Sequence, residues 1–326
     1  MPSRRPIVLV LVLGLGLVAC DDGGDDAGPV TTAAAATTEP AAATTATDAA
    51  TTAPSDPPTT ASSAPAELAP ADWTVQPGSE QIAVLDAEPV TELRLVGGAD
   101  ERTGTVDEQG SLLFRDVPPG EYRIESDTVT TAPVEVMSLD DVPPASFYES
   151  QQLPAGGYGY LTTRDGTTLS VNVVLPGPPE AGPYPTLVEY SGYQPSNPDD
   201  TGINALFTAL GYAYVGVNMR GSGCSGGSFE FFEPAQSLDG YDVIETVAAQ
   251  PWVLGHRVGM VGVSYPGISQ LFVASTQPPS LEAIVPGHVI GDFYRDVAYP
   301  GGVLNYAFAA LFSIDQDARS AFPSSY

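Results

Sequence analysis

The sequence predicts an α/β fold with a mostly parallel sheet, preceded by a small β-sandwich module. From about residue 155 onward, short apolar runs alternate with segments of helical spacing, which is typical of parallel strands joined by crossover helices. Residues 72–150 hold only short strand-like runs separated by turns rich in glycine and proline. Near residue 264 a predicted strand is followed by a predicted helix, and the turn between them contains a serine that is a candidate nucleophile.

Composition excludes several kinds of protein before any motif is considered. The 326 residues carry 11 basic and 40 acidic side chains, for a formal net charge of −29, and every basic residue is arginine. Without lysine there is no P-loop lysine, no Schiff-base lysine and no Ser–Lys dyad. An acidic surface repels nucleic acid, because binding requires the phosphates to be neutralised. We expect no nucleic-acid partner, no cofactor and no metal site.

The first 20 residues are typical of a bacterial lipoprotein signal peptide. Arg4 and Arg5 form its charged start, residues 7–18 are apolar, and residues 17–20 read Leu-Val-Ala-Cys, which resembles a lipobox. The apolar stretch is short for a membrane-spanning helix. We therefore expect Cys20 to be acylated and to anchor an exported protein to the outer face of the bacterial cell membrane. A plain secretory signal with an incidental cysteine is the alternative.

Residues 21–71 form an Ala-, Thr- and Pro-rich tether that we expect to be disordered, because no aromatic residue precedes Trp73. The sandwich module follows at residues 72–150. Its residues 117–124 resemble the closing hairpin of transthyretin-like, carboxypeptidase-regulatory-like modules. We expect a spacer or accessory role, with substrate binding as the alternative. The predicted strands cover residues 93–96, 112–114, 122–124 and 134–136.

The predicted α/β domain covers residues 155–326. Short apolar runs predict buried strands, and apolar residues at i, i+3 and i+4 predict helices. The strands are expected at residues 169–175, 186–190, 212–217 and 258–263, and again from residue 283. The helices are expected at residues 203–210 behind a Thr201 cap, at 238–249, after residue 264, and on the face formed by Leu304, Phe308 and Leu311.

Residues 262–267 read Gly-Val-Ser-Tyr-Pro-Gly and place Ser264 on the turn between a strand and a helix. This is the arrangement of a nucleophile elbow, in which the serine backbone is strained and the hydroxyl is exposed above the sheet. Gly262 and Gly267 would let strand and helix approach closely, and Pro266 fits the first helical turn. The free N–H groups of the helix would point toward negative charge forming at Ser264. An ordinary strand-to-helix turn is the alternative.

Five ordered segments of this domain carry a family likeness. They are residues 163–169 (Thr-Arg-Asp-Gly-Thr-Thr-Leu), 190–193 (Tyr-Ser-Gly-Tyr), 219–223 (Met-Arg-Gly-Ser-Gly), 264–267 (Ser-Tyr-Pro-Gly) and 281–295. Together they resemble the α/β-hydrolase domain of the X-Pro dipeptidyl-peptidase and cocaine-esterase-like family, over slightly more than half of the chain. The chain departs from the family at Gly192, where proline is common, and at Asn218, where aspartate is usual.

The resemblance implies acyl transfer at Ser264, which would attack an ester or amide carbonyl and form an acyl-enzyme. It also implies that the Tyr193 hydroxyl and the backbone N–H of Tyr265 bind the developing oxyanion. The alternative for Tyr193 is a loop tyrosine packed on the sheet edge.

Two further residues are expected to have structural roles. Arg220 is expected to anchor its loop by pairing with Asp239 or Asp242. Cys224 is the only cysteine besides Cys20. Because exported proteins usually pair their cysteines, Cys224 is expected to be either a buried free thiol or half of a disulfide whose partner is not in this chain.

The sequence offers no well-placed histidine to act as the catalytic base. The chain has two histidines; His256 is expected on the surface, and His288 follows Ser264 too closely for the usual order of serine, acid and histidine. The resemblance implies an acid and a histidine beyond residue 326 and a domain truncated in its helical cap, so we expect little hydrolase turnover from this chain. Ester, X-Pro peptide and acylase specificities stay open. A non-catalytic surface-anchored binding lipoprotein and an inactive fragment are the alternatives to an enzyme.

Overall fold

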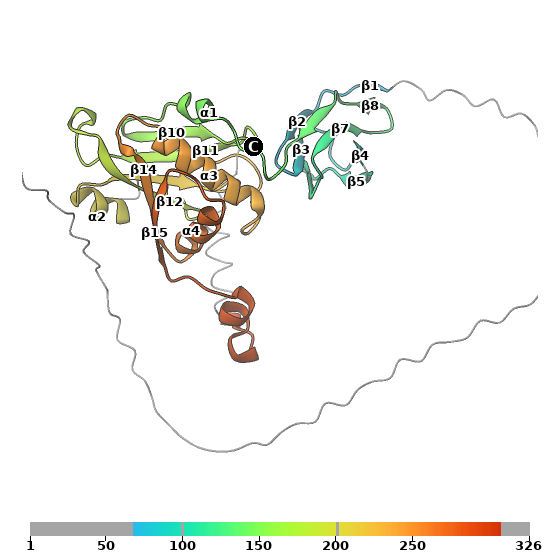
Figure 1. The fold of residues 1–326 in the computed structure, drawn as a ribbon. Helices are drawn as coiled ribbons and strands as arrows, with labels where there is room; N and C mark the ends of the chain where they lie inside the picture. The colour runs from blue at the N-terminus through green and yellow to red at the C-terminus, as the bar shows by residue number, and fades with distance from the viewer. Residues whose placement is uncertain (1–67, 99–100, 200–201, 308–326) are drawn as a thin grey trace, which may run out of the picture. The chain divides into compact units, whose positions relative to one another are not determined.

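A computed structural model of the protein describes residues 68–98, 101–199 and 202–307 (Figure 1). The predicted signal peptide, the lipid site Cys20 and nearly all of the predicted tether lie outside these residues, as do Phe308 and Leu311 of the predicted last helix. No helix within the described ranges is long and apolar enough to cross a membrane.

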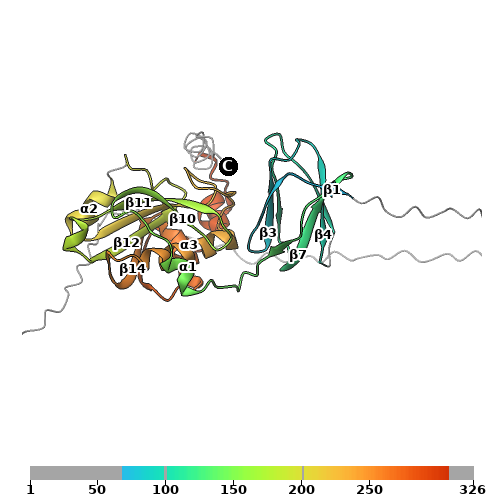
Figure 2. The same cartoon turned by 90° about the horizontal axis from the view of Figure 1, so that it is seen from above.

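The first folded part is a β-sandwich of two sheets, which Figure 2 shows as two layers. One sheet has the order β1-β8-β7-β4-β5, with β9 paired to β7, and the other has the order β2-β3-β6. The strands are β1 (Ala69–Pro70), β2 (Thr74–Pro77), β3 (Gln81–Leu85), β4 (Glu92–Gly97), β5 (Arg102–Thr105), β6 (Leu112–Arg115), β7 (Gly120–Glu125), β8 (Val129–Thr130) and β9 (Val134–Val136). All four strands predicted for this module are confirmed, as β4, β6, β7 and β9.

Alternation along the strands builds the core of the sandwich. Ile82 and Val84 of β3 are fully buried, as are Leu93 of β4 and Ile124 of β7 from the other sheet. Successive side chains of a strand point to opposite faces, so the residues between these point outward. β3 was not predicted, because its outer face also carries apolar residues and this hides the alternation. β2, β5 and β8 were not predicted either, and β1 falls within the residues assigned to the tether.

The second folded part is built on one mixed sheet with the order β10-β11-β13-β12-β14-β15. β11 runs antiparallel to both of its neighbours, and the pairs from β13 to β15 are parallel. The strands are β10 (Gly157–Thr162), β11 (Thr168–Val174), β12 (Tyr184–Ser191), β13 (Ala213–Asn218), β14 (Val253–Val263) and β15 (Leu281–Gly287). The predicted α/β class is confirmed, although β10, with its Gly-Tyr-Gly-Tyr sequence, was not predicted.

The helices are α1 (Ala145–Glu149), α2 (Ile203–Ala209), α3 (Pro234–Ala248) and α4 (Tyr265–Ser275), with short turns at Pro179–Ala181, Tyr294–Ala298 and Pro300–Gly302. The N-cap of α2 is Gly202 and not the predicted Thr201, which lies outside the described residues. α3 begins earlier than the predicted residue 238, because Pro234 has the fixed φ that suits a first helical turn. α3 and α4 lie close together, since a Cβ on Gly240 would collide with Val273.

The order of the strands sets the place of a site. β12 lies between β13 and β14, so the next strand along the chain, β13, pairs with one edge of β12, and the strand after it, β14, pairs with the other edge. In an open α/β sheet, ligands bind at such a switch point, beyond the carboxyl ends of the strands. β12 ends at Ser191 and its parallel neighbour β14 ends at Val263. The segments that carry Tyr193 and Ser264 therefore leave the sheet side by side.

Candidate active site

Ser264 occupies the turn between β14 and α4, with a φ of 67° and a ψ of −121°. A positive φ is rare for a residue with a side chain and persists only where the surrounding structure enforces it. The Ser264 N–H donates to the carbonyl of Gly287 at 2.9 Å. Its carbonyl in turn accepts the N–H groups of Gly267 and Ile268, each at 2.8 Å. Ser264 is exposed, so the strained turn expected of an elbow is present.

Two glycines make this turn sterically possible. A Cβ on Gly262 would come within 2.5 Å of the Cβ of Pro266. A Cβ on Gly267 would overlap the carbonyl oxygen of Gly287, at the end of β15. The close approach predicted for both glycines is therefore confirmed, and the reason is steric: strand, turn and helix meet at distances that exclude a side chain.

The structure brings the two expected oxyanion-binding residues together. The Tyr193 ring packs against the Tyr265 ring, with centroids 5.5 Å apart and planes at 54°. The Tyr193 backbone N–H donates to the Ser191 hydroxyl at 3.1 Å, which fixes the loop after β12. Tyr265 is the first residue of α4, so its backbone N–H has no acceptor within the helix. A donor at this helix terminus is placed next to Ser264 by the chain itself.

An aromatic wall surrounds Tyr265. Phe231 stacks on the Tyr265 ring at 5.2 Å with planes at 6°, and Phe232 and Phe229 contact the same ring at 4.9 and 6.4 Å. Phe231 is 43% exposed and Phe229 is 42% exposed, whereas Tyr265 is buried. Burial raises the pKa of Tyr265 well above its ordinary value. This wall was not predicted, although the run Phe-Glu-Phe-Phe at residues 229–232 is visible in the sequence.

Neither histidine bonds to Ser264 in the part of the chain that the structure describes. The ring nitrogen Nδ1 of His256 lies 2.8 Å from the carbonyl of Ala248, and the residue is exposed, as predicted. His288 follows Gly287 directly and is also exposed. Its backbone is therefore near Ser264 through the Gly287 carbonyl, but no hydrogen bond of its ring is found among the described residues.

Arg220 is buried and paired with two carboxylates, as its predicted anchoring role requires. Its Nε donates to Asp239 Oδ2 at 2.6 Å, and its Nη2 donates to Asp239 Oδ1 at 2.5 Å and to Asp165 Oδ2 at 2.9 Å. Burial alone would lower the pKa of Arg220, but Asp239 and Asp165 outweigh it and raise the pKa. Burial raises the pKa of Asp239, and Arg220 opposes this rise; the two-point geometry favours the ionised pair.

Asp242, the other predicted partner of Arg220, is bound elsewhere. Its carboxylate accepts Arg164 Nη2 at 2.8 Å and the Tyr148 hydroxyl at 2.9 Å, all within the interior. This pair ties the segment before β11 to α3. Asp239 and Asp242 of α3 thus hold two different arginines.

Cys224 is free and exposed, so the expectation of a buried thiol is wrong. It lies in the Gly- and Ser-rich loop after β13, where few side chains are available to cover it. No group of three or more metal-ligating side chains occurs within residues 68–98, 101–199 and 202–307.

Comparison with known proteins finds similarities over the second folded part. Residues 165–323 match the X-Pro dipeptidyl-peptidase (S15) family. Cocaine esterase of Rhodococcus sp. (strain MB1 Bresler) is 34% identical over 147 residues, which cover 44% of this chain and 25% of that protein. A protein of Mycobacterium tuberculosis (strain CDC 1551 / Oshkosh), provisionally named a serine esterase, is 30% identical over 164 residues, which cover 44% of this chain and 26% of that protein.

The chain spans about a quarter of the length of these relatives. A solved CocE/NonD family hydrolase from Staphylococcus aureus is 25% identical, with a TM-score of 0.45, and the likeness covers 56% of this chain and 39% of that one. Residues 165–323 of this chain are therefore similar to the X-Pro dipeptidyl-peptidase (S15) family and to cocaine esterase, and the family match covers slightly less than half of the chain.

Proposed function

We propose that this chain carries the nucleophile of a serine hydrolase that cleaves ester or amide bonds through an acyl-enzyme on Ser264. The observation that carries the proposal is an exposed serine held at a strained φ and ψ, beyond the carboxyl ends of β12 and β14. Serine Oγ bonds to the carbonyl carbon, the C–O or C–N bond breaks, and the alcohol or amine leaves with the hydroxyl proton. Water then hydrolyses the acyl-serine ester and restores the hydroxyl.

On this proposal, the Tyr265 N–H and the Tyr193 hydroxyl bind the oxyanion of the tetrahedral intermediate. The contact between the two rings, with centroids 5.5 Å apart, supports this proposal because it brings Tyr193 next to the residue that follows Ser264. Each donor of this kind contributes about 3–4 kcal/mol of transition-state stabilisation in comparable sites.

None of the described residues is placed to act as the general base for Ser264. His256 is bound to a backbone carbonyl, His288 makes no hydrogen bond to Ser264 among the described residues, and the sequence has no lysine. We infer that neither His256 nor His288 is the general base of Ser264. The substrate class follows the family: an ester, as the name of cocaine esterase indicates, or an X-Pro peptide bond.

The same proposal includes an anchor. The lipobox-like residues 17–20 support acylation of Cys20 and attachment of the exported protein to the outer face of the cell membrane. Detergent phase partitioning tests this: the unmodified protein should enter the detergent phase, and Cys20→Ala should stay in the aqueous phase. Equal partitioning of the two into water would rule the anchor out.

Labelling with a fluorophosphonate probe tests the nucleophile. We expect the probe, applied to the protein in cells of its source, to modify a peptide that contains Ser264, and Ser264→Ala to abolish the labelling. Ser275→Ala is the matched control, because Ser275 is an exposed serine at the end of the same helix. Labelling that survives Ser264→Ala would show that another residue is the nucleophile.

A further inference from the structure

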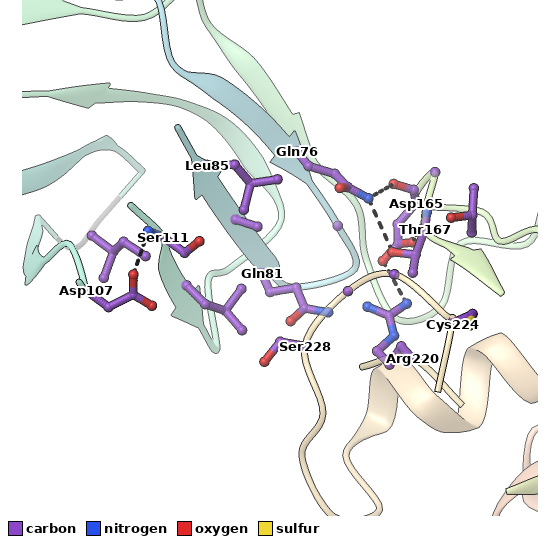
Figure 3. Close-up of a pocket in the computed structure, with 18 of the residues that line it drawn as sticks. Gln76, Gln81, Leu85, Asp107, Ser111, Asp165, Thr167, Arg220, Cys224 and Ser228 are labelled. Atoms are coloured by element: carbon purple, nitrogen blue, oxygen red, sulfur yellow. Dashed lines mark hydrogen bonds and ion pairs between the residues drawn. The ribbon is translucent and has the colours of Figure 1, made fainter. Parts of the chain in front are cut away.

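A cavity of about 380 Å³ has a lining that includes none of the proposed catalytic residues. One wall is the outer face of the sheet β2-β3-β6, and the other is formed by residues 165–168 and 220–228 (Figure 3). The volume falls at the lower end of the range for small-molecule sites.

The sandwich wall has an apolar centre. Ile82 and Val84 of β3 point into the sandwich core, so Ala83 and Leu85 point to the outer face and line the cavity. Leu113 of β6 is paired with Ala83 across the sheet and lines the same cavity. A row of aliphatic side chains therefore offers a flat apolar surface to a ligand.

Two glutamines flank this surface and differ in their partners. Gln76 Nε2 donates to the Asp165 carbonyl at 3.3 Å and to the Thr167 hydroxyl at 3.2 Å. Gln81 is only 8% exposed, and its Nε2 has no acceptor among the residues described. Figure 3 shows the amide end of Gln81 directed toward Arg220 and Ser228 on the other wall. A buried amide donor without an acceptor is costly and indicates a place for one.

The charges of the lining exclude two classes of ligand. Arg220 is the one basic residue among the lining residues described, and Asp239 and Asp165 already bind it. Asp107 also lines the cavity, where it accepts the backbone N–H groups of Gln109 and Ser111. Carboxylates without a free cation repel an anion, and the described residues hold no cluster able to bind a metal ion. A neutral ligand with its own hydrogen-bonding groups fits best.

We propose that this cavity binds a neutral carbohydrate of about disaccharide size, in a site separate from Ser264. A sugar alternates hydroxyl groups with apolar C–H faces, which matches an aliphatic surface flanked by amide, hydroxyl and carboxylate groups. An extended peptide usually binds by adding a strand to a sheet edge. β3 is paired on both sides, by β2 and β6, so it offers its face and not an edge.

Calorimetric titration of the purified full chain with N,N′-diacetylchitobiose tests the proposal, because its acetamide oxygens can accept the Gln81 amide. We expect saturable binding with a Kd of about 1 mM or tighter. Gln81→Leu should weaken binding roughly tenfold, and it should not unfold the protein, because it removes an unpaired buried amide. Ala83→Trp should abolish binding by filling the cavity. Circular dichroism and the Tm verify the fold of both variants.

Ser264→Ala is the control that separates this site from the proposed catalytic one, and it should bind the disaccharide like the wild type. No saturable binding of N,N′-diacetylchitobiose, cellobiose or maltose at about 10 mM would overturn the proposal. Binding that survives Ala83→Trp would place the sugar elsewhere and also overturn it. Tighter binding of the dipeptide Ala-Pro, lost in Ala83→Trp, would show that the cavity recognises a peptide instead. None of these outcomes bears on labelling at Ser264.

Discussion

Ser264 and Arg220 follow the ends of β14 and β13, the two strands that flank β12, and their surroundings are opposite. Arg220 is buried, and two carboxylates bind its guanidinium within 2.9 Å. Ser264 is exposed on a strained backbone, and its Oγ has no hydrogen-bond partner in the described part of the chain. Both positions lie at the same end of the sheet.

The difference separates a structural role from a chemical one. A buried ion pair is retained where every donor and acceptor is satisfied, and it then fixes the loop that carries it. A strained backbone has the opposite meaning, since strain lowers stability and persists where the surrounding structure holds a group ready to react. Three experiments test this contrast.

The largest expected effect concerns turnover by residues 1–326. If Ser264 has no base within this chain, hydrolysis of p-nitrophenyl acetate and Ala-Pro-p-nitroanilide by the purified chain should be on the order of 10⁶-fold slower than by a complete triad. His256→Ala and His288→Ala should leave the residual rate unchanged. Efficient turnover that disappears in His288→Ala alone would mean that the elbow is paired after all, and the contrast with Arg220 would fail.

The elbow around Ser264 could be predicted from the sequence, whereas the partners in the buried ion pairs could not, and the reason is physical. The elbow is local: Gly262, Pro266 and Gly267 lie within three residues of Ser264 and impose its geometry through short-range sterics. The partners of Arg220 are distant in sequence. Composition and spacing could name Asp239 as a candidate but could not exclude Asp242, because only packing decides which carboxylate of α3 faces which arginine.

The strands β10 and β3 were not predicted, because their formation also depends on partners distant in the sequence. β10 and β3 lack a clear alternation of apolar and polar residues, because each has residues of similar polarity on both faces. Their pairing with β11 and β6 supplies what local propensity does not. The run of phenylalanines at residues 229–232 is visible in the sequence, but its contact with Tyr265 is not, because only the fold brings the loop after β13 to the start of α4.

The second prediction removes the buried pair. Asp239→Ala leaves the Arg220 charge with Asp165 alone, so the free energy of unfolding should fall by about 3–5 kcal/mol. Glu282→Ala is the matched control, because its pair with Arg257 has a similar distance of 3.1 Å but side chains that are 62% and 66% exposed. That variant should lose less than about 1 kcal/mol. Urea unfolding of both measures the difference, and equal losses would contradict the structural role assigned to Arg220.

The smallest expected effect has the opposite sign and concerns the strain at Ser264. Glycine adopts a φ of 67° without steric penalty, so Ser264→Gly should remove a strain of about 1–3 kcal/mol. Glycine also gains freedom in the unfolded chain, which offsets about 0.5–1 kcal/mol of this. The net expectation is a rise of about 1 kcal/mol in the free energy of unfolding. Ser264→Ala keeps the Cβ and hence the strain, and it loses no hydrogen bond found in the described structure, so it should match the wild type. Both variants should lose labelling by the fluorophosphonate probe. If the glycine variant is no more stable than the alanine variant in urea unfolding, the turn stores no strain, and Ser264 would differ from Arg220 in exposure alone.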